Sequence, residues 1–213
     1  MKKKLTLVVA FVLVFALGVA GTFAYLTAKT DAVVNTFTVG EVGDLSLTET
    51  TGSNAQGQGG AHKIIPGVPT SKDPKVSYAA EETDEAVYVF VKIEADAWSF
   101  DADSNTYTYL QNDKACLSWS VNTTDWTAVS GSTGVYYKAL AAGTDLAATS
   151  VITNDQIAVN GTNVTEANIN NVATGAGSLT FTAYAIQQAG FDGDVAAAWT
   201  ALQDQLTPPT TTP

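Results

Sequence analysis

The chain has 213 residues, enough for one domain and too few for two of ordinary size. Its formal net charge is −11, and all of its basic residues are lysines. Such an acidic chain lacks the cations that neutralise phosphates, which argues against a nucleic-acid partner and against docking on anionic lipid. One cysteine and one histidine exclude an internal disulfide and a Cys/His metal cage. With 46% apolar and 15% charged residues, a packed core is expected.

Residues 1–24 have the layout of an export signal. A lysine triplet precedes an uninterrupted apolar run that extends to Ala20, and small residues follow it. Cleavage between Ala24 and Tyr25 fits the small-x-small pattern of signal peptidase sites. Cleavage after Ala20 is one alternative. An uncleaved anchor is another, because the uncharged stretch is long enough to span a bilayer. We expect processing, and no membrane contact after it.

Apolar and polar residues alternate in many short segments after this signal, with turn residues between them. The clearest alternation covers residues 87–94, where four aliphatic side chains share one face. Eight or nine such segments predict an all-β fold, a β-sandwich or jelly roll. The predicted organisation is a signal peptide (1–24), an N-terminal extended segment (25–43), a jelly-roll domain (44–206) and a Thr/Pro tail (207–213).

One segment near the C-terminus follows a helical period instead. Asp194 is placed to cap a helix over residues 195–206. Four side chains fall on one face at helical spacing and predict a helix that docks on the core: Val195, Ala198, Trp199 and Leu202.

The sequence offers little to build a catalytic or metal site. His62 is the only histidine and is expected in a solvated loop, so no zinc protease site can be assembled. Asp101, Asp103 and Asn105 match the first three ligand positions of a calcium loop. The glycine and the acidic residue expected later in that loop are missing, and the tip of a β-hairpin explains these residues better. We therefore expect no enzyme activity, no catalytic residues and no cofactor.

Four tryptophans leave a different class of function open, a monomeric cell-surface module that binds a glycan or a host ligand. Trp119 and Trp199 lie on apolar faces and are expected in the core. Trp126 is the best candidate for an exposed ring that stacks on a ligand. Cys116 is expected to be a half-buried small apolar residue rather than a reactive thiol.

The region around the predicted cleavage site carries a motif of its own. Residues 21–24 read GTFA, Tyr25 follows, and residues 35–40 read NTFTVG. This pattern resembles the export signature of the TasA-like and camelysin-like proteins of Gram-positive bacteria, which use a dedicated signal peptidase of the SipW type. The later stretches 64–76 and 179–202 look like the proline turn and the closing strand and helix of exported relatives.

The resemblance implies an extracellular jelly-roll subunit at the cell surface that builds biofilm-matrix fibres by self-association. Each new N-terminus would complete the open sheet of the next subunit, giving a head-to-tail homopolymer. Strand addition is physically reasonable for an extended segment with few charges. The same segment can also fold back as the first strand of its own domain, and periodicity alone does not distinguish the two. The predicted donor residues are Tyr25, Leu26, Val33, Val34, Phe37 and Val39. The predicted acceptor groove is lined by Val87, Val89, Val91 and Ile93.

Overall fold

The computed structural model describes residues 27–29, 43–49, 62–81 and 84–207. This part of the chain is mostly β, with thirteen strands in three antiparallel sheets and two α-helices. The prediction of an all-β protein is confirmed. The strands outnumber the eight or nine expected because several are only two or three residues long, too short for an alternating pattern.

The strand order of each sheet places sequence-distant segments side by side. The first sheet runs β1 (Thr27–Lys29), β13 (Thr180–Gln187), β5 (Val87–Glu94), β10 (Val135–Leu140) and β9 (Thr127–Ala128). The second sheet runs β11 (Leu146–Ser150), β4 (Lys75–Ala79) and β2 (Asp44–Thr48). The third sheet runs β3 (Thr70–Ser71), β12 (Gln156–Val159), β8 (Lys114–Ser120), β7 (Thr106–Gln111) and β6 (Ser99–Asp101).

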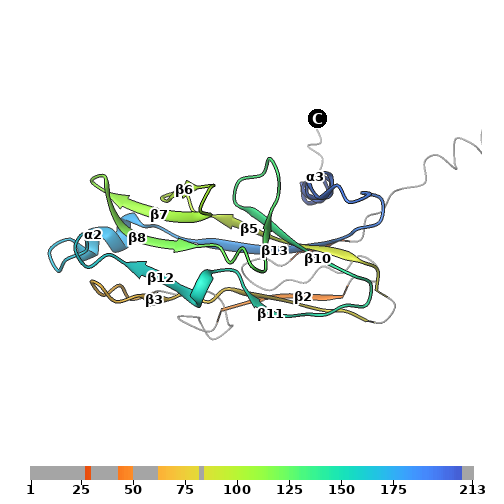
Figure 1. Ribbon diagram of the computed structural model, residues 1–213, viewed down its shortest axis with the longest axis horizontal. Coiled ribbons are helices and arrows are strands. Elements are labelled where there is room, and N and C mark those ends of the chain that lie inside the picture. Colours follow the sequence, from red (N-terminus) through yellow and green to blue (C-terminus); the bar gives the residue numbers. More distant parts are fainter. Residues whose placement is uncertain (1–26, 30–42, 50–61, 82–83, 208–213) are drawn as a thin grey trace, which may run out of the picture.

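These sheets form two layers with the core between them. Figure 1 places β5, β10 and β13 in one layer and β2 and β11 in the other. The third sheet reaches from one layer to the other at the end of the molecule where α2 lies, with β6 and β7 above and β12 and β3 below (Figure 1). The main hydrophobic core therefore draws residues from all three sheets.

Strand β5 is buried on both faces, which its sequence explains. Val87, Val89 and Val91 point into the main core and are at most 1% exposed. Tyr88 and Phe90 point to the opposite face and belong to a second apolar cluster. Residues 87–91 therefore form a continuous apolar run, as expected where a strand is covered on both sides, and the polar Lys92 and Glu94 lie beyond it.

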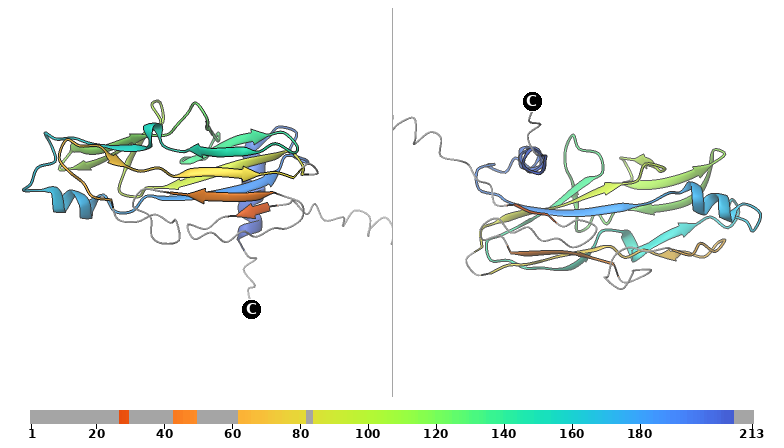
Figure 2. Two further views of the ribbon diagram at one scale, coloured as in Figure 1. Left: turned by 90° about the horizontal axis from the view of Figure 1, so that it is seen from below. Right: turned by 180° about the vertical axis from the view of Figure 1, so that it is seen from behind.

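The second cluster exists because helix α3 (Val195–Leu206) covers the outer face of the first sheet. Figures 1 and 2 show this helix on the outside of the layer that contains β5 and β13. The predicted helix is confirmed, and the Asp194 side chain accepts a hydrogen bond from the Ala197 amide at 2.9 Å. Trp199 packs on Phe90 and Tyr184, with ring centroids 5.3 and 5.5 Å away.

A second helix, α2 (Ile169–Gly175), was not expected from the sequence. Its segment is rich in asparagine, which has low helix propensity. The helix ends where Gly175 meets Tyr109, and a Cβ atom at position 175 would overlap the tyrosine hydroxyl. Glycine lets the helix end close to strand β7.

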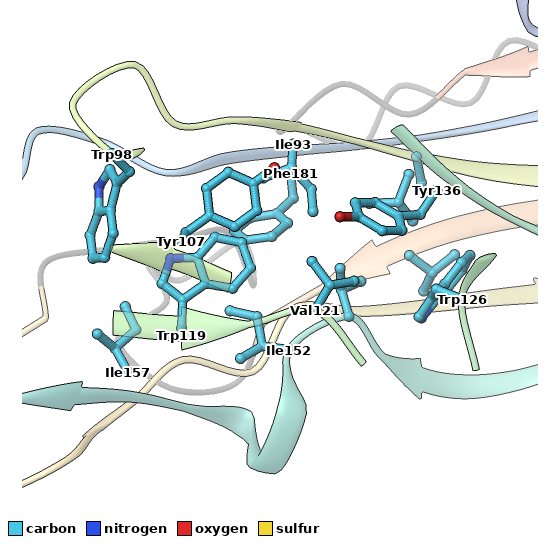
Figure 3. Packing of buried hydrophobic residues seen from close by; sticks show 14 of the residues in the cluster. Ile93, Trp98, Tyr107, Trp119, Val121, Trp126, Tyr136, Ile152, Ile157 and Phe181 are labelled. Atoms are coloured by element: carbon cyan, nitrogen blue, oxygen red, sulfur yellow. The ribbon is translucent and has the colours of Figure 1, made fainter. Parts of the chain in front are cut away.

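Aromatic rings form the centre of the main core (Figure 3). Trp119 on β8 stacks on Tyr107 of β7, with centroids 4.3 Å apart and planes 6° from parallel. Phe181 on β13 lies 5.8 Å from Trp119 and links these rings to the first sheet. Such ring pairs add stabilisation beyond the area that they bury.

Burial of Tyr107 makes the protein sensitive to alkali. Its surroundings raise the pKa of the Tyr107 phenol to about 12, because the phenolate would lose its hydration. Burial raises the pKa of Tyr136 as well. Unfolded tyrosines release their protons above about pH 10. Between that pH and about 12 the unfolded state binds fewer protons than the folded state, so stability falls as the pH rises.

We therefore expect the free energy of unfolding to fall between pH 10 and 12, with Tyr107 contributing about 2 to 3 kcal/mol. Urea titrations across this range measure the slope. Tyr107→Phe should reduce the slope, whereas Tyr137→Phe, at a half-buried ring, should leave it close to wild type. Equal slopes in wild type and Tyr107→Phe would contradict the assignment.

Within the described residues, none of the helices has both the length and the apolar character needed to cross a membrane.

Candidate functional site

Strand β1 pairs with β13 and forms one edge of the first sheet, and β9 forms the other edge. It pairs antiparallel in a single register, with Thr27, Ala28 and Lys29 opposite Ile186, Ala185 and Tyr184. The described part of β1 thus covers three of the eight residue positions of β13. The segment that precedes the domain in sequence therefore adds a strand to a sheet whose other described strands begin at Val87.

The second sheet has its own edge strand at the same side of the molecule. β2 is the last strand of that sheet, and it contacts both β1 and β13. Figure 2 shows β1 and β2 next to each other when the molecule is seen from below. Both edge strands come from the N-terminal part of the chain, so this segment determines how that side of the two layers is covered.

Most of the predicted donor segment lies outside the described residues. This applies to the predicted cleavage junction, Ala24 and Tyr25, and to the donor residues Leu26, Val33, Val34, Phe37 and Val39. Their roles stay predictions. What is described of the segment is β1.

The predicted acceptor strand is an interior strand. β5 pairs with β13 along residues 87–94 and with β10 along residues 87–92. The side chains predicted to line the acceptor groove belong to the main core, and all are buried: Val87, Val89, Val91 and Ile93. An added strand needs unpaired backbone groups. The edge at which the N-terminal segment pairs belongs to β13, one strand further out than the sequence suggested.

A buried ion pair lies between the layers near this edge, and sequence reasoning missed it. Lys72, just after β3, donates from Nζ to Glu49 Oε2 at 2.7 Å, and Glu49 directly follows β2. The two side chains are 7% and 8% exposed. Lys72 Nζ also lies 5.3 Å from the centre of the Phe181 ring on β13. No sequence pattern distinguishes this lysine from the exposed ones.

The prediction that His62 is a solvated loop residue is wrong. Its side chain is 17% exposed, and Nε2 lies 3.2 Å from Glu49 Oε1. Neither of these two buried atoms has another hydrogen-bond partner among the described residues. They can share a hydrogen bond only when the imidazole carries a proton on Nε2. Glu49 is thus contacted on one carboxylate oxygen by Lys72 and on the other by His62.

The three calcium candidates lie in the β6–β7 hairpin, where they shape the turn. Asp101 accepts hydrogen bonds from the Ser104 hydroxyl at 2.7 Å and from the Asp103 amide at 3.0 Å. These bonds hold the pKa of Asp101 below its usual value. Asn105 has a positive φ of 51° and accepts from the Tyr136 hydroxyl at 3.0 Å. In the described ranges, no group of three or more metal-ligating side chains occurs.

The prediction of an exposed Trp126 is also wrong. Its side chain is 1% exposed, and the indole Nε1 donates to the Ser150 carbonyl at 3.0 Å. Its short segment of mixed polarity gave no sign that the chain folds back over the ring. Trp119 and Trp199 are buried, as predicted. Cys116 is buried more completely than expected, at 1% exposure.

Comparisons with known proteins give no match, whether with family models, with curated proteins or with solved structures.

Proposed function

We propose that the protein is a secreted structural subunit of an extracellular fibre or biofilm matrix. Subunits join head to tail by donor-strand exchange, in which the N-terminal segment of one chain pairs with the β13 edge of the next. The observation that carries the proposal is the antiparallel pairing of Thr27–Lys29 with β13. It supports the proposal because a segment N-terminal to the domain is able to serve as an edge strand.

Exchange keeps the same contacts and changes only which chain supplies them. Swapping an identical element between copies needs little extra free energy, and an interface that does not close on itself produces a filament. Main-chain hydrogen bonds give the added strand its affinity, and alternate side chains give it its register. The proposal therefore requires only that residues 25–43 reach a neighbour instead of folding back.

The likeness of residues 21–40 to the export signature of TasA-like and camelysin-like proteins supports the same reading. On the basis of this likeness we propose that a dedicated signal peptidase cleaves the chain between Ala24 and Tyr25. We also propose that the two-layer β fold is a jelly roll. Donor-strand exchange is compatible with such a fold, since a sheet with a missing edge strand exposes backbone groups that a neighbour can pair.

Cysteines placed at Ala28 and Ala185 distinguish donation from folding back, because the two residues are directly opposite in the register. Opposite residues on neighbouring strands have Cα atoms about 4.5 to 5.5 Å apart, within reach of a disulfide. In a Cys116→Ala background, we expect oxidation of Ala28→Cys/Ala185→Cys to give a ladder of covalent oligomers on a denaturing gel. A cross-linked monomer alone would contradict exchange. Ala28→Cys without its partner is the control.

Electron microscopy of truncated chains tests polymerisation itself. A chain beginning at Tyr25 should form filaments, and a chain beginning at Asp44 should stay monomeric because it lacks the donor segment. Phe37→Asp in the longer chain should abolish filaments without unfolding the domain. Leu110→Asp, at an exposed position of β7, is the matched control and should form normal filaments. Normal filaments from Phe37→Asp would contradict the role of the segment.

The alternative function, a monomeric module that binds a glycan or a host ligand, gains no support from the described residues. All four tryptophans are at most 9% exposed. A ring that stacks on a sugar must present its face to solvent, so the indoles offer no such platform.

A further inference from the structure

The contact between Lys72 and Glu49 differs from the other lysine–carboxylate pairs in the described ranges. Lys75, Lys92 and Lys138 pair with carboxylates while their own side chains are 30% exposed or more. Lys72 and Glu49 are both more than nine-tenths buried, with Nζ and Oε2 at 2.7 Å. Removing two opposite charges from water requires free energy, and their mutual attraction often fails to offset the lost hydration.

We propose that Lys72 and Glu49 become joined by an intramolecular amide bond between Nζ and Cδ. Oε2 is bonded directly to Cδ, so the amine nitrogen already lies close to the carbon that it attacks. Productive geometries hold reacting atoms about 3 to 3.5 Å apart. Burial beneath the Phe181 ring excludes water, and the neutral states are reached by moving one proton from Nζ to Oε2 along their hydrogen bond.

The reaction is a condensation that needs no other reactant. The neutral amine of Lys72 attacks Cδ of the protonated Glu49 carboxyl, and the C–N bond forms. Negative charge develops on Oε1, which faces His62 Nε2 at 3.2 Å. A second proton then passes from Nζ to Oε2, the Cδ–Oε2 bond breaks, and Oε2 leaves as water. Oε1 remains as the amide carbonyl oxygen, and nothing is oxidised or reduced.

His62 has a defined part in this step. With its proton on Nε2, the imidazole donates to Oε1 and stabilises the oxyanion, as positioned donors do in acyl transfer. This proton position is also the one that satisfies both buried atoms before the reaction. The imidazole keeps its proton, so it is present unchanged after the amide has formed.

The amide ties the end of β2 to the segment between β3 and β4 and closes a loop from residue 49 to residue 72. A cross-link of this kind restricts the unfolded chain as a disulfide does. With one cysteine, the chain has no internal disulfide available for this purpose. The proposal concerns stability of the domain and does not depend on whether subunits polymerise.

Mass spectrometry of the purified wild-type protein decides the matter. We expect an intact mass that is one water molecule lower than the mass calculated for the processed chain. Trypsin should give a branched peptide in which residues 30–63 are joined to residues 64–75, because a linked Lys72 is not cleaved. An unshifted mass with a free peptide of residues 64–72 would overturn the proposal. So would a lost water without the branched peptide, since dehydration elsewhere gives the same mass.

Substitutions then show which side chains form the amide bond. Lys72→Arg, which keeps the charge but lacks the amine, and Glu49→Ala should both restore the full mass of their sequences. Lys75→Arg is the matched control and should still lack one water. In a time course that starts from unfolded chains isolated before the link has formed, His62→Ala should slow formation of the link by about 100-fold, the effect of losing one oxyanion donor. An unchanged rate would overturn the part given to His62.

Discussion

Replacing Trp119 with alanine should lower the free energy of unfolding by about 4 kcal/mol, because it removes a large buried ring from the centre of the main core. Trp119 is 3% exposed and stacks on Tyr107 at 4.3 Å. Its ring also contacts Trp98 and Phe181, so the substitution takes a neighbour from three other aromatic side chains (Figure 3). Urea titration followed by circular dichroism measures the change.

The matched control is Trp119→Phe, which removes the indole nitrogen and keeps an aromatic ring. Trp119 Nε1 is buried and has no hydrogen-bond partner among the described residues. Trp119→Phe keeps a ring and removes this unsatisfied donor, so it should cost less than half as much as alanine. A loss below about 1 kcal/mol for Trp119→Ala would show that the core closes over the vacated space.

The second large loss of stability is expected in the second apolar cluster, between α3 and the first sheet. Leu202 is fully buried between α3 and the first sheet. Leu202→Asp places an unpaired charge where water is excluded. We expect the free energy of unfolding to fall by about 4 kcal/mol, as for other unpaired buried charges. The helix should detach while the main core, which does not include α3, stays folded.

Hydrogen exchange and binding of a hydrophobic dye separate detachment from global unfolding. Amides of α3 should exchange early, and the uncovered rings of Tyr88 and Phe90 should bind dye, while β5 amides stay protected. Thr200→Asp, on the exposed side of the same helix, should change neither measurement. Simultaneous loss of protection in α3 and β5 would mean that the helix and the sandwich unfold as one unit.

The periodicity of apolar residues within a segment predicted those strands and helices whose structure depends mainly on residues close together in the sequence. Strand β5 and helix α3 were identified from periods of two and of 3.6, and the Asp194 cap from its position alone. The alternation in β5 also showed which residues face the main core. It did not show that Tyr88 and Phe90 are covered as well, because that depends on a helix one hundred residues further along the chain.

Features that depend on contacts between segments far apart in the sequence were missed, because the pattern of one segment does not show its partners. The edge that receives β1 is decided by which strands flank β5, and strand order is not encoded in any one segment. Trp126 and His62 lie in polar stretches that resemble loops, yet other parts of the chain cover both side chains. The ion pair of Lys72 with Glu49 joins residues from two loops, so only the folded chain brings them together.

The direction of the longest ladder has a mechanical consequence. β5 and β13 pair over eight residue positions and run along the long axis of the molecule (Figure 1). Tension applied along this axis through β1 acts parallel to the strands, so the hydrogen bonds of each ladder carry the load together and are not opened one at a time. The described part of β1 contributes three paired positions against eight for β5. Under such tension β1 would slide off β13 first, and the two-layer body behind it would stay intact.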